Sequence, residues 1–573
     1  MSSVKSNRAA VWGLLVLSCG TNAPNQSVDP ARENPPAAPV ADAGGSPQFR
    51  VDAGSPNPTT PLFLLSTSPR SGATLVYAET PFVATFSEPL DPTSANPTSV
   101  RVSLEPAAGA PVPVAVTIAA AAATLTVTPV VPFETNAVFS VTITTAIRGQ
   151  SGATLARDAR SSFTTRPWTI QTGTEYGDNG IGVAVDAIGN VFLGGGTSGN
   201  LHGLTLHETP GENAGDGFLS KYKPSGEREW TRLVGSSSGD GIGAVAVTPS
   251  GEIVIAGTTS GPVDAQPHSG GYDVVVAKFD TNGSRLWTKQ FGSEVNDYGS
   301  AVAVDANGNV LVAVETSGSI GDQRNLGISD IAVVKLSPAG AWLWAKQLGS
   351  AYDEIGGAIA TDSAGNVFVA AITFGTFPGQ RLFGDMDAVL AKLDSSGNLT
   401  WARQLGTPQK DVAVGVAVDS AGAAYLSGWT LGGLDGHPSA GDSDTFVVKY
   451  GATGAKLWSR QFGTTRGDSA SMGGIAIRRN GGVVVTGVTY GSLDGTTRQT
   501  AGDGYLVAFD SDGTQLWLRQ FGTTQHDYPA ALATSADGSF FVTGYTYGTF
   551  SGNSGMGDTD AFLMKLNPDG IPR

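Results

Sequence analysis

The chain has 573 residues, too many for one compact core, so we expect several domains or an array of repeats. Charged residues make up 15% of it and glycine fills 78 positions, a balance that favours short strands joined by tight turns over helices. The formal net charge of −16 argues against a nucleic-acid partner, because binding to phosphates requires clustered Lys and Arg.

Residues 1–18 have the pattern of a secretion signal. Lys5 and Arg8 precede an apolar run at 9–17, which is too short to span a bilayer. The run leads into Val16-Leu17-Ser18-Cys19-Gly20, which resembles the lipobox of bacterial lipoproteins. That resemblance implies cleavage before Cys19, the only cysteine, and lipid attachment to it. The alternative is an ordinary secretory signal with an incidental cysteine. Residues 19–60, rich in Pro and Ala, are expected to form a disordered tether.

Residues 61–166 predict a small β-sandwich. Apolar residues alternate at 82–86, 124–128 and 138–144, with turn signals between them. The stretch 69–93, with its TFSEPLD segment, the segment 124–129 and the closing SFTT at 162–165 resemble the bacterial Ig-like domain of S-layer and other surface proteins. The resemblance implies a stalk, with a ligand-binding module as the alternative.

The rest of the chain repeats a unit that opens with Trp, any four residues and Gly. A repeat of about 57 residues indicates an array or a propeller rather than one folded core. Within the third unit, strand-like segments recur at 287–292, 301–305, 309–314 and 330–335, which is typical of a four-stranded propeller blade. The seven opening residues are Trp168, Trp230, Trp287, Trp344, Trp401, Trp458 and Trp517.

The number of strands predicts how the array closes. The Trp strand near 168–173 has no apolar strand before it, and the apolar strand 560–566 has no Trp strand after it. We therefore predict an all-β chain in which the Ig-like β-sandwich is followed, over 167–573, by a seven-bladed β-propeller of four-stranded blades. The strand near 168–173 would join the last blade, so that no sheet edge stays exposed.

The repeats also resemble a known family. The segment DAVLAKLDSSGNLTWARQLG from Asp387, the segment GVAVDSAG from Gly415, and their counterparts along 168–573 are similar to the SBBP family of seven-bladed β-propeller repeats in bacterial extracellular proteins. The resemblance implies the fold and an extracellular setting, and it supplies no catalytic residues.

Two acidic positions recur in every repeat, and we expect both on one rim of the ring. They could bind a cation such as calcium, or a polyhydroxyl ligand, at the channel mouth. The alternative, which we favour, is that each carboxylate caps backbone N–H groups of its own loop. The first set is Asp178, Asp240, Asp297, Glu354, Asp411, Asp468 and Asp527; the second is Asp216, Asp273, Asp330, Asp387, Asp444, Asp503 and Asp560.

Two further repeated residues have structural interpretations. A Lys follows the second acidic position in six repeats and is expected at the far rim, exposed or beside another blade; Ala508 replaces it in the sixth repeat. The Trp residues are expected to pack between blades, although a ring of aromatic side chains could also bind sugars. The Lys set is Lys221, Lys278, Lys335, Lys392, Lys449 and Lys565.

Signatures of catalysis or of a cofactor are weak. Turn sequences such as 305–309 and 510–513 resemble calcium loops only faintly, because the spacing and the distal Glu of an EF-hand are missing. The five histidines, His202, His207, His268, His437 and His526, occupy non-equivalent repeat positions and predict no zinc site. We expect no catalytic or cofactor-binding residue and no bound metal, and we place specificity in the loops 197–215, 258–272, 374–386 and 430–443.

These observations favour a non-enzymatic lipoprotein of the bacterial cell envelope, exported and anchored in the membrane by lipid on Cys19. Its role would be adhesion, scaffolding or recognition of an extracellular protein or glycan, as a monomer. The alternatives are a polysaccharide-active enzyme with a site in the central pocket, and a purely structural envelope protein. The enzyme would require Asp, Glu, His, Tyr or Arg that belong to only some of the blades.

Overall fold

The computed structural model describes residues 61–76, 80–106, 110–130, 133–135, 137–207, 215–495 and 501–573. Residues 1–60, which include Cys19, lie outside the described part, so the signal and the tether remain predictions. The chain divides into two compact units, one formed mainly by residues before 165 and one by residues from 165 onward, and each is described by itself. Within the described part there are four single-turn 3₁₀ helices and no α-helix: η1 (Pro92–Ser94), η2 (Leu201–Gly203), η3 (Val263–Ala265) and η4 (Leu434–Gly436).

The first unit consists of two antiparallel sheets. One has the strand order β1-β3-β7-β6 and the other β2-β9-β8-β4-β5. The alternating pattern of β3 places Phe82, Ala84 and Phe86 in the core, and Phe139 on β8 stacks on Phe163 of β9 at a centroid distance of 5.8 Å. The strands are β1 (Leu64–Ser68), β2 (Ala73–Val76), β3 (Phe82–Phe86), β4 (Val100–Glu105), β5 (Val112–Pro113), β6 (Val116–Ala121), β7 (Thr124–Pro129), β8 (Val138–Ile143) and β9 (Ala159–Thr165).

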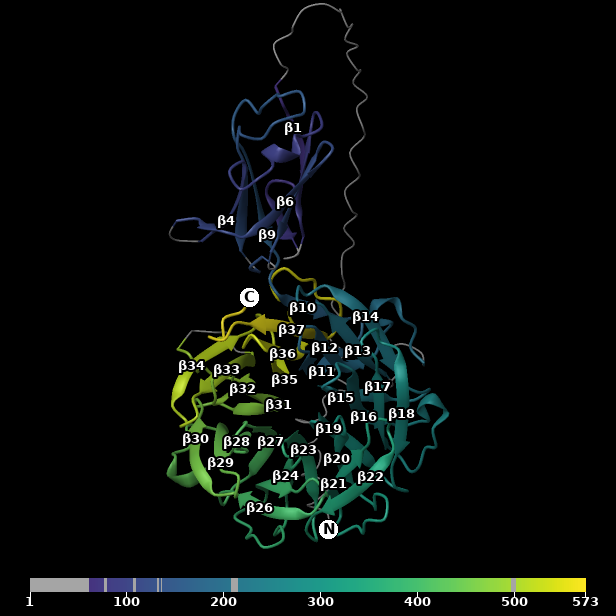
Figure 1. Ribbon diagram of the computed structural model, residues 1–573. Helices are drawn as coiled ribbons and strands as arrows, with labels where there is room; N and C mark the ends of the chain where they lie inside the picture. The colour runs from purple at the N-terminus through teal and green to yellow at the C-terminus, as the bar shows by residue number, and fades with distance from the viewer. Residues whose placement is uncertain are drawn as a thin grey trace, which may run out of the picture. The chain divides into compact units, whose positions relative to one another are not determined.

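The second unit contains, among its described residues, seven four-stranded antiparallel sheets (Figure 1). We number them in chain order from the first sheet, β11–β14, to the seventh, which is β35–β37 with β10 at its edge. The strands of the first four sheets are β11 (Asp178–Val185), β12 (Val191–Thr197), β13 (Asp216–Tyr222) and β14 (Arg228–Val234); β15 (Asp240–Val247), β16 (Ile253–Thr259), β17 (Asp273–Phe279) and β18 (Arg285–Phe291); β19 (Asp297–Val304), β20 (Val310–Thr316), β21 (Asp330–Leu336) and β22 (Trp342–Leu348); β23 (Glu354–Thr361), β24 (Val367–Thr373), β25 (Asp387–Leu393) and β26 (Leu399–Leu405).

The remaining three sheets continue the same order. Their strands are β27 (Asp411–Val418), β28 (Ala424–Thr430), β29 (Asp444–Tyr450) and β30 (Lys456–Phe462); β31 (Asp468–Ile477), β32 (Val483–Thr489), β33 (Asp503–Phe509) and β34 (Gln515–Phe521); β35 (Asp527–Thr534), β36 (Phe540–Thr546), β37 (Asp560–Leu566) and β10 (Thr169–Thr172).

Burial explains the sequence pattern within each sheet. The two middle strands are buried on both faces, as in β20 and β21, and both read as almost continuous apolar runs. The first strand is rich in Gly and Ala and lies against the first strand of the neighbouring sheet, where side-chain space is smallest. The fourth strand contains or directly follows the repeated Trp, and most of its residues are half-exposed. Gly340, with φ of +77°, forms the tight turn between β21 and β22 that a side chain would strain.

The strand near the first Trp pairs with the last strand of the chain. Thr169 to Thr172 of β10 lie antiparallel to Met564 to Ala561 of β37, so the seventh sheet joins segments almost four hundred positions apart. Figure 1 shows β10 beside β37, with β35 and β11 following one another. β11 contacts both β15 and β35, as every other first strand contacts two neighbours.

Each repeated Lys bridges to the following sheet. In the first five sheets its exposed fraction is only 4–8%, and its ammonium donates to a backbone carbonyl in the hairpin turn of the next sheet at 3.0–3.4 Å. The indole N–H of the Trp paired with it donates to the same carbonyl at 3.0–3.3 Å. The Trp residues therefore join adjacent sheets, as predicted. Of the two positions expected for the Lys, exposed or beside another blade, the structure shows the second, because the Lys and the Trp donate to the same acceptor.

The sixth sheet departs from this arrangement. Ala508 takes the place of the Lys and pairs in register with Trp517, whose indole nitrogen is buried without a hydrogen-bond partner. Arg478 stands in the turn where Asp419 of the fifth sheet approaches Lys449 at 3.6 Å. The sixth sheet therefore lacks both the Lys and the acidic partner of the Lys, because Arg478 occupies the position of that acid.

Candidate functional site

The acidic residues of the first set begin the first strand of each sheet, and they cap the loops that precede them. Each is at most 8% exposed. Asp297 accepts hydrogen bonds through Oδ2 from the backbone N–H of Ser293 at 2.5 Å and from its hydroxyl at 2.8 Å. The residue four positions before the acid plays the same part in every sheet; these residues are Thr174, Ser236, Ser293, Ser350, Thr407, Thr464 and Thr523. The carboxylates therefore serve their own loops and do not line an open channel mouth.

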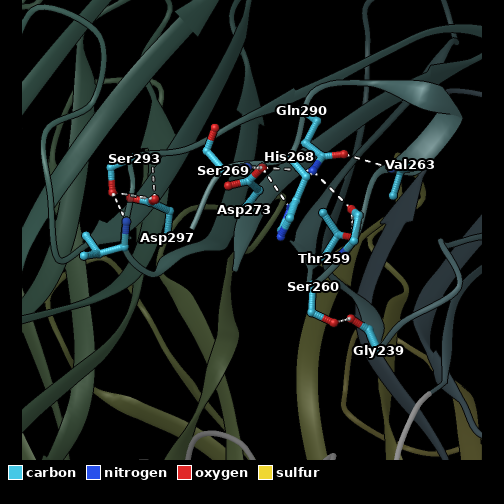
Figure 2. Close-up of polar contacts among 12 residues, drawn as sticks. Gly239, Thr259, Ser260, Val263, His268, Ser269, Asp273, Gln290, Ser293 and Asp297 are labelled. Carbon is cyan, nitrogen blue, oxygen red and sulfur yellow. Dashed lines mark hydrogen bonds and ion pairs between the residues drawn. The ribbon is translucent and has the colours of Figure 1, made fainter. Parts of the chain in front are cut away.

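The acidic residues of the second set begin the third strand and hold the long loop before it. Asp273 accepts through Oδ2 from the side chain of Gln290 at 2.9 Å and from the N–H of Ser269 at 2.9 Å. Gln290 in turn accepts from the N–H of Val263 at 2.9 Å, so that one amide joins both ends of the loop. Figure 2 shows Asp273 beside His268 and Gln290, with Asp297 next to Ser293.

This Gln is a structural residue that the sequence interpretation missed, although it recurs three positions after the Trp. It stands in six of the described sheets at 2.7–2.9 Å from the acid: Gln171, Gln290, Gln347, Gln404, Gln461 and Gln520. In the first sheet Leu233 replaces it, and His207 Nδ1 lies 2.8 Å from Asp216 instead. His268 Nδ1 lies 3.1 Å from Asp273. Two of the scattered histidines therefore serve loop contacts.

The second acid of one repeat and the first acid of the next form a close pair around the Gly that lies five positions after the Trp. A methyl group built on Gly292 would collide with Oδ1 of Asp273 and lie 2.9 Å from Oδ2 of Asp297. The Oδ1 atoms of both residues are buried without a hydrogen-bond partner. Burial raises the pKa of the first-set acids, and it raises the pKa of Asp178 and Asp240 to about 6; in each repeat the neighbouring carboxylate of the pair adds to the rise.

These pairs are poor metal sites. Cations of the calcium type require six to eight oxygen ligands, whereas each pair offers two carboxylates whose Oδ2 atoms already accept from the loops. In the described ranges no group of three or more His, Cys, Asp or Glu residues is placed to hold a metal ion. The turn at Asp305 resembled a calcium loop, but its carboxylate accepts from Asn307 and Asn309 and pairs with Lys335 at 3.0 Å.

His202 is held between two hydroxyl groups. Its ring lies 2.7 Å from the hydroxyl of Thr172 and 2.9 Å from that of Thr231. Burial lowers the pKa of its ring to about 4, so it is neutral at physiological pH and links β10 to β14. Since both ring nitrogens are used in this way, His202 is a structural contact and not a presented acid or base.

A cluster of aromatic rings, which the sequence did not lead us to predict, lies in the sixth and seventh sheets. It consists of Tyr490, His526, Tyr528, Tyr545 and Tyr547, hereafter the five-ring cluster. Tyr528 stacks on Tyr545 at a centroid distance of 5.1 Å and on His526 at 5.8 Å. A comparison of equivalent positions could have found it, because the residues equivalent to Tyr545 in other repeats include Gly196 and Thr258.

A separate apolar groove lies between the second and third sheets. Phe291, Gly292, Ile320, Gly321 and Trp342 line a volume of about 370 Å³, and Trp342 meets Phe291 edge-on at 5.3 Å. Its lining contains no charged side chain. The groove lacks the convergent polar groups that orient a small-molecule ligand.

Comparisons with known proteins identify both units. The bacterial Ig-like domain matches residues 58–165, and the β-propeller repeat matches residues 286–321 and 400–435. A regulatory protein named FlaEY from Caulobacter vibrioides is 33% identical over 164 residues, which is 26% of this chain and 17% of that protein, so the chain spans about a sixth of that relative's length.

Two solved structures show a distant similarity to the chain. The WD40 domain of Neurospora crassa Pan2 is similar at 9% identity and a TM-score of 0.37, and the matched region covers 67% of this chain and 88% of the Pan2 domain. A PL25 ulvan lyase is similar at 10% identity and a TM-score of 0.41, and the matched region covers 70% of this chain and 98% of the lyase. In the described part of the chain, no helix has the length and apolar character needed to cross a membrane. The chain therefore joins a bacterial Ig-like domain to a set of β-propeller repeats, as the resemblances in its sequence predicted.

Proposed function

We propose that this chain is an exported, non-enzymatic recognition or scaffolding protein of the bacterial cell surface. The observation that carries the proposal is the division of labour between repeated and non-repeated residues. The repeated Asp, Gln and Thr or Ser side chains are used inside each sheet to hold loops, as Asp297 does with Ser293. The side chains that differ between repeats are therefore left for contact with a partner.

We also infer that the seven sheets close into a seven-bladed ring. The pairing of β10 with β37 and the contacts of β11 with both β15 and β35 support this inference. Trp168 adds to it, because its indole donates to the carbonyl of Pro224 in the first sheet at 2.6 Å. A closed ring is a rigid scaffold that positions variable loops.

Location rests on two separate grounds. The bacterial Ig-like domain favours an extracellular or surface setting. Attachment through lipid on Cys19 is the finer proposal, and it follows from the lipobox resemblance alone. The several acyl chains of a bacterial lipoprotein would make this attachment stable, since one chain anchors only marginally.

A polysaccharide-active enzyme is the competing function. General acid–base catalysis needs a titratable group within hydrogen-bond reach of the substrate. The repeated carboxylates are buried in loop caps, and His202 is enclosed between two hydroxyls, which favours recognition over catalysis.

One experiment tests anchoring and function together. The full chain and its Cys19→Ala variant are expressed in a Gram-negative host, and cells are fractionated. We expect the parent in the membrane fraction and the variant in the soluble fraction. The soluble variant is then incubated with envelope proteins and polysaccharides. Saturable binding with no change in polymer length supports the proposal, whereas depolymerisation contradicts it.

A further inference from the structure

The five-ring cluster lies where loops of the sixth and seventh sheets meet. Tyr490 directly follows β32, and Tyr547 directly follows β36 at the equivalent position. His526 directly precedes β35, and Tyr528 pairs in register with Tyr545 across β35 and β36. The rings are therefore held by strand ends, which fix their positions better than free loops would.

The rings contact one another and remain accessible. Tyr547 is 50% exposed and meets His526, Tyr528 and Tyr545 edge-on at 6.3–6.4 Å, while the other rings are half-buried. The hydroxyls of Tyr490 and Tyr528 lie 3.2 Å apart. His526 Nδ1 accepts from the N–H of Gly502 at 2.9 Å, so the neutral ring carries its proton on Nε2 as a donor.

The fold does not require these rings. At the position of the Tyr528–Tyr545 pair the first sheet has Asn179 and Gly196, and the second has Gly241 and Thr258, with the same register. Tyr547 is 50% exposed, whereas Phe562 on the neighbouring β37 is fully buried. Single aromatic residues stand at these positions in two other sheets, Tyr298 in the third and Trp429 in the fifth, but the five rings that contact one another belong to the sixth and seventh sheets. The cluster is a local addition to a repeated scaffold.

The chemistry of the cluster fits sugars. Each ring offers an apolar face and a polar atom at its edge, which suits the apolar face and the hydroxyls of a sugar ring. The hydroxyls stay un-ionised, because burial raises the pKa of Tyr528 and Tyr545 far above the usual value. The chain carries a net charge of −16, which disfavours approach of an acidic polymer.

We propose that the five-ring cluster binds a neutral polysaccharide, with pyranose rings stacked on Tyr545 and Tyr547 and their hydroxyls bonded to the tyrosine hydroxyls and to His526. This inference rests on the proposed recognition function and names its ligand class. A protein ligand and an acidic polysaccharide are the outcomes that would contradict it.

The test is affinity electrophoresis of the full chain carrying Cys19→Ala. Native gels contain β-glucan, xylan, mannan or galactan as neutral polymers, and alginate or polygalacturonate as acidic ones; calorimetry then gives the Kd for any polymer that retards the protein. We expect a neutral polymer to retard it, and Tyr547→Ala to weaken that binding about tenfold, as loss of a stacked ring should. Tyr545→Ala should act in the same direction.

Tyr352→Ala is the matched control. Tyr352 is 57% exposed in the loop before β23, outside the cluster, and its removal should leave the Kd within about twofold. Tyr547 is exposed, so its variant should keep the parent's melting temperature, which guards against loss of binding through unfolding.

The remaining outcomes separate this inference from the function it rests on. Neutral-polymer binding that both cluster variants leave unchanged overturns the five-ring site and leaves the recognition function standing. Binding only to acidic polymers, or only to a protein, overturns the ligand class. Retardation by none of the polymers overturns the inference, and the recognition function is then judged by the envelope-protein incubation alone.

Discussion

Lys278 and Trp287 face each other in register on β17 and β18 and donate to one carbonyl oxygen, that of Pro338 in the following sheet. Gly340, two residues further along that turn, lies so close to the indole of Trp287 that a methyl group on it would sit 3.0 Å from the ring. Three contacts thus connect the two sheets at a single turn: the ammonium of Lys278, the indole N–H of Trp287, and the packing of Gly340 against the indole ring. This arrangement recurs, so its contribution can be measured one sheet at a time.

Removing one of these Trp side chains should destabilise the repeat unit. Trp401 is 8% exposed and donates to the carbonyl of Ala452 at 3.2 Å. We expect Trp401→Ala to lower the free energy of unfolding by about 3–5 kcal/mol, measured by guanidinium denaturation. Leu343→Ala is the control, because Leu343 is 49% exposed, and a loss as large as that of Trp401→Ala would refute the role of the inter-sheet contact.

The sixth sheet allows the charged half of this contact to be tested. Ala508→Lys alone should destabilise the protein, because the new ammonium would be buried near Arg478 rather than near an Asp. Adding Arg478→Asp should recover part of the loss, with a coupling free energy of about 1–3 kcal/mol in a double-mutant cycle. Strict additivity of the two substitutions would show that the Lys and the turn acid do not interact.

The Gly that lies five positions after each Trp should not tolerate a side chain, because there is no space for one. Gly292→Ala places a methyl group against Asp273 and Asp297 and should cost about 1–3 kcal/mol of unfolding free energy. Gly241→Ala serves as the control, since nothing lies within 4 Å of the added atom. Equal melting temperatures for the two variants would contradict the close carboxylate pair.

The same pairs predict how stability depends on pH. The folded-state pKa of Asp178 and Asp240 is raised from 3.8 to about 6 by burial, so between these values the folded chain binds more protons than the unfolded one. Their contribution is present below about pH 4 and is lost as pH rises through 6. His202 acts in the opposite sense, because its pKa is lowered from 6.5 to about 4 and its contribution is lost as pH falls.

Since burial raises the pKa of all seven acids of the first set, and His202 opposes them, we expect the melting temperature to rise from pH 7.5 to pH 5. Asp240→Asn should flatten part of this rise, because the amide is uncharged at every pH. Calorimetric melts at the two pH values decide the point, and a melting temperature that falls on acidification to pH 5 would contradict it.

Deletion of residues 168–173 tests ring closure. The deletion removes the edge strand of the seventh sheet and exposes β37, so the melting temperature of the full chain should drop by roughly 10 °C or more. An unchanged melting temperature for this deletion would overturn the closed ring.

The sequence predicted the parts of this molecule that depend on periodicity. The Trp spacing and the apolar strands sufficed for the four-stranded units, and the unpartnered strand near Trp168 predicted its pairing partner. The close pairing of Asp273 with Asp297 could not be predicted, because the two residues begin different strands and meet only when one sheet packs on the next. The five-ring cluster was missed for a similar reason. Tyr528 and Tyr545 pair within one hairpin, but Tyr490 belongs to the preceding sheet, and the signal lies in how these residues differ from those at equivalent positions.

The pairing of β10 with β37 has a consequence for the time course of folding. Six sheets are made from strands that follow one another directly, so each can form as soon as its own segment is available. The seventh must wait for β37, while β10, the first strand of this unit to be made, stays without its partner until β37 is available. The barrier for that last step contains the entropy of closing the longest loop in the unit. The slowest refolding event should therefore report on Trp168, whichever sheet forms first.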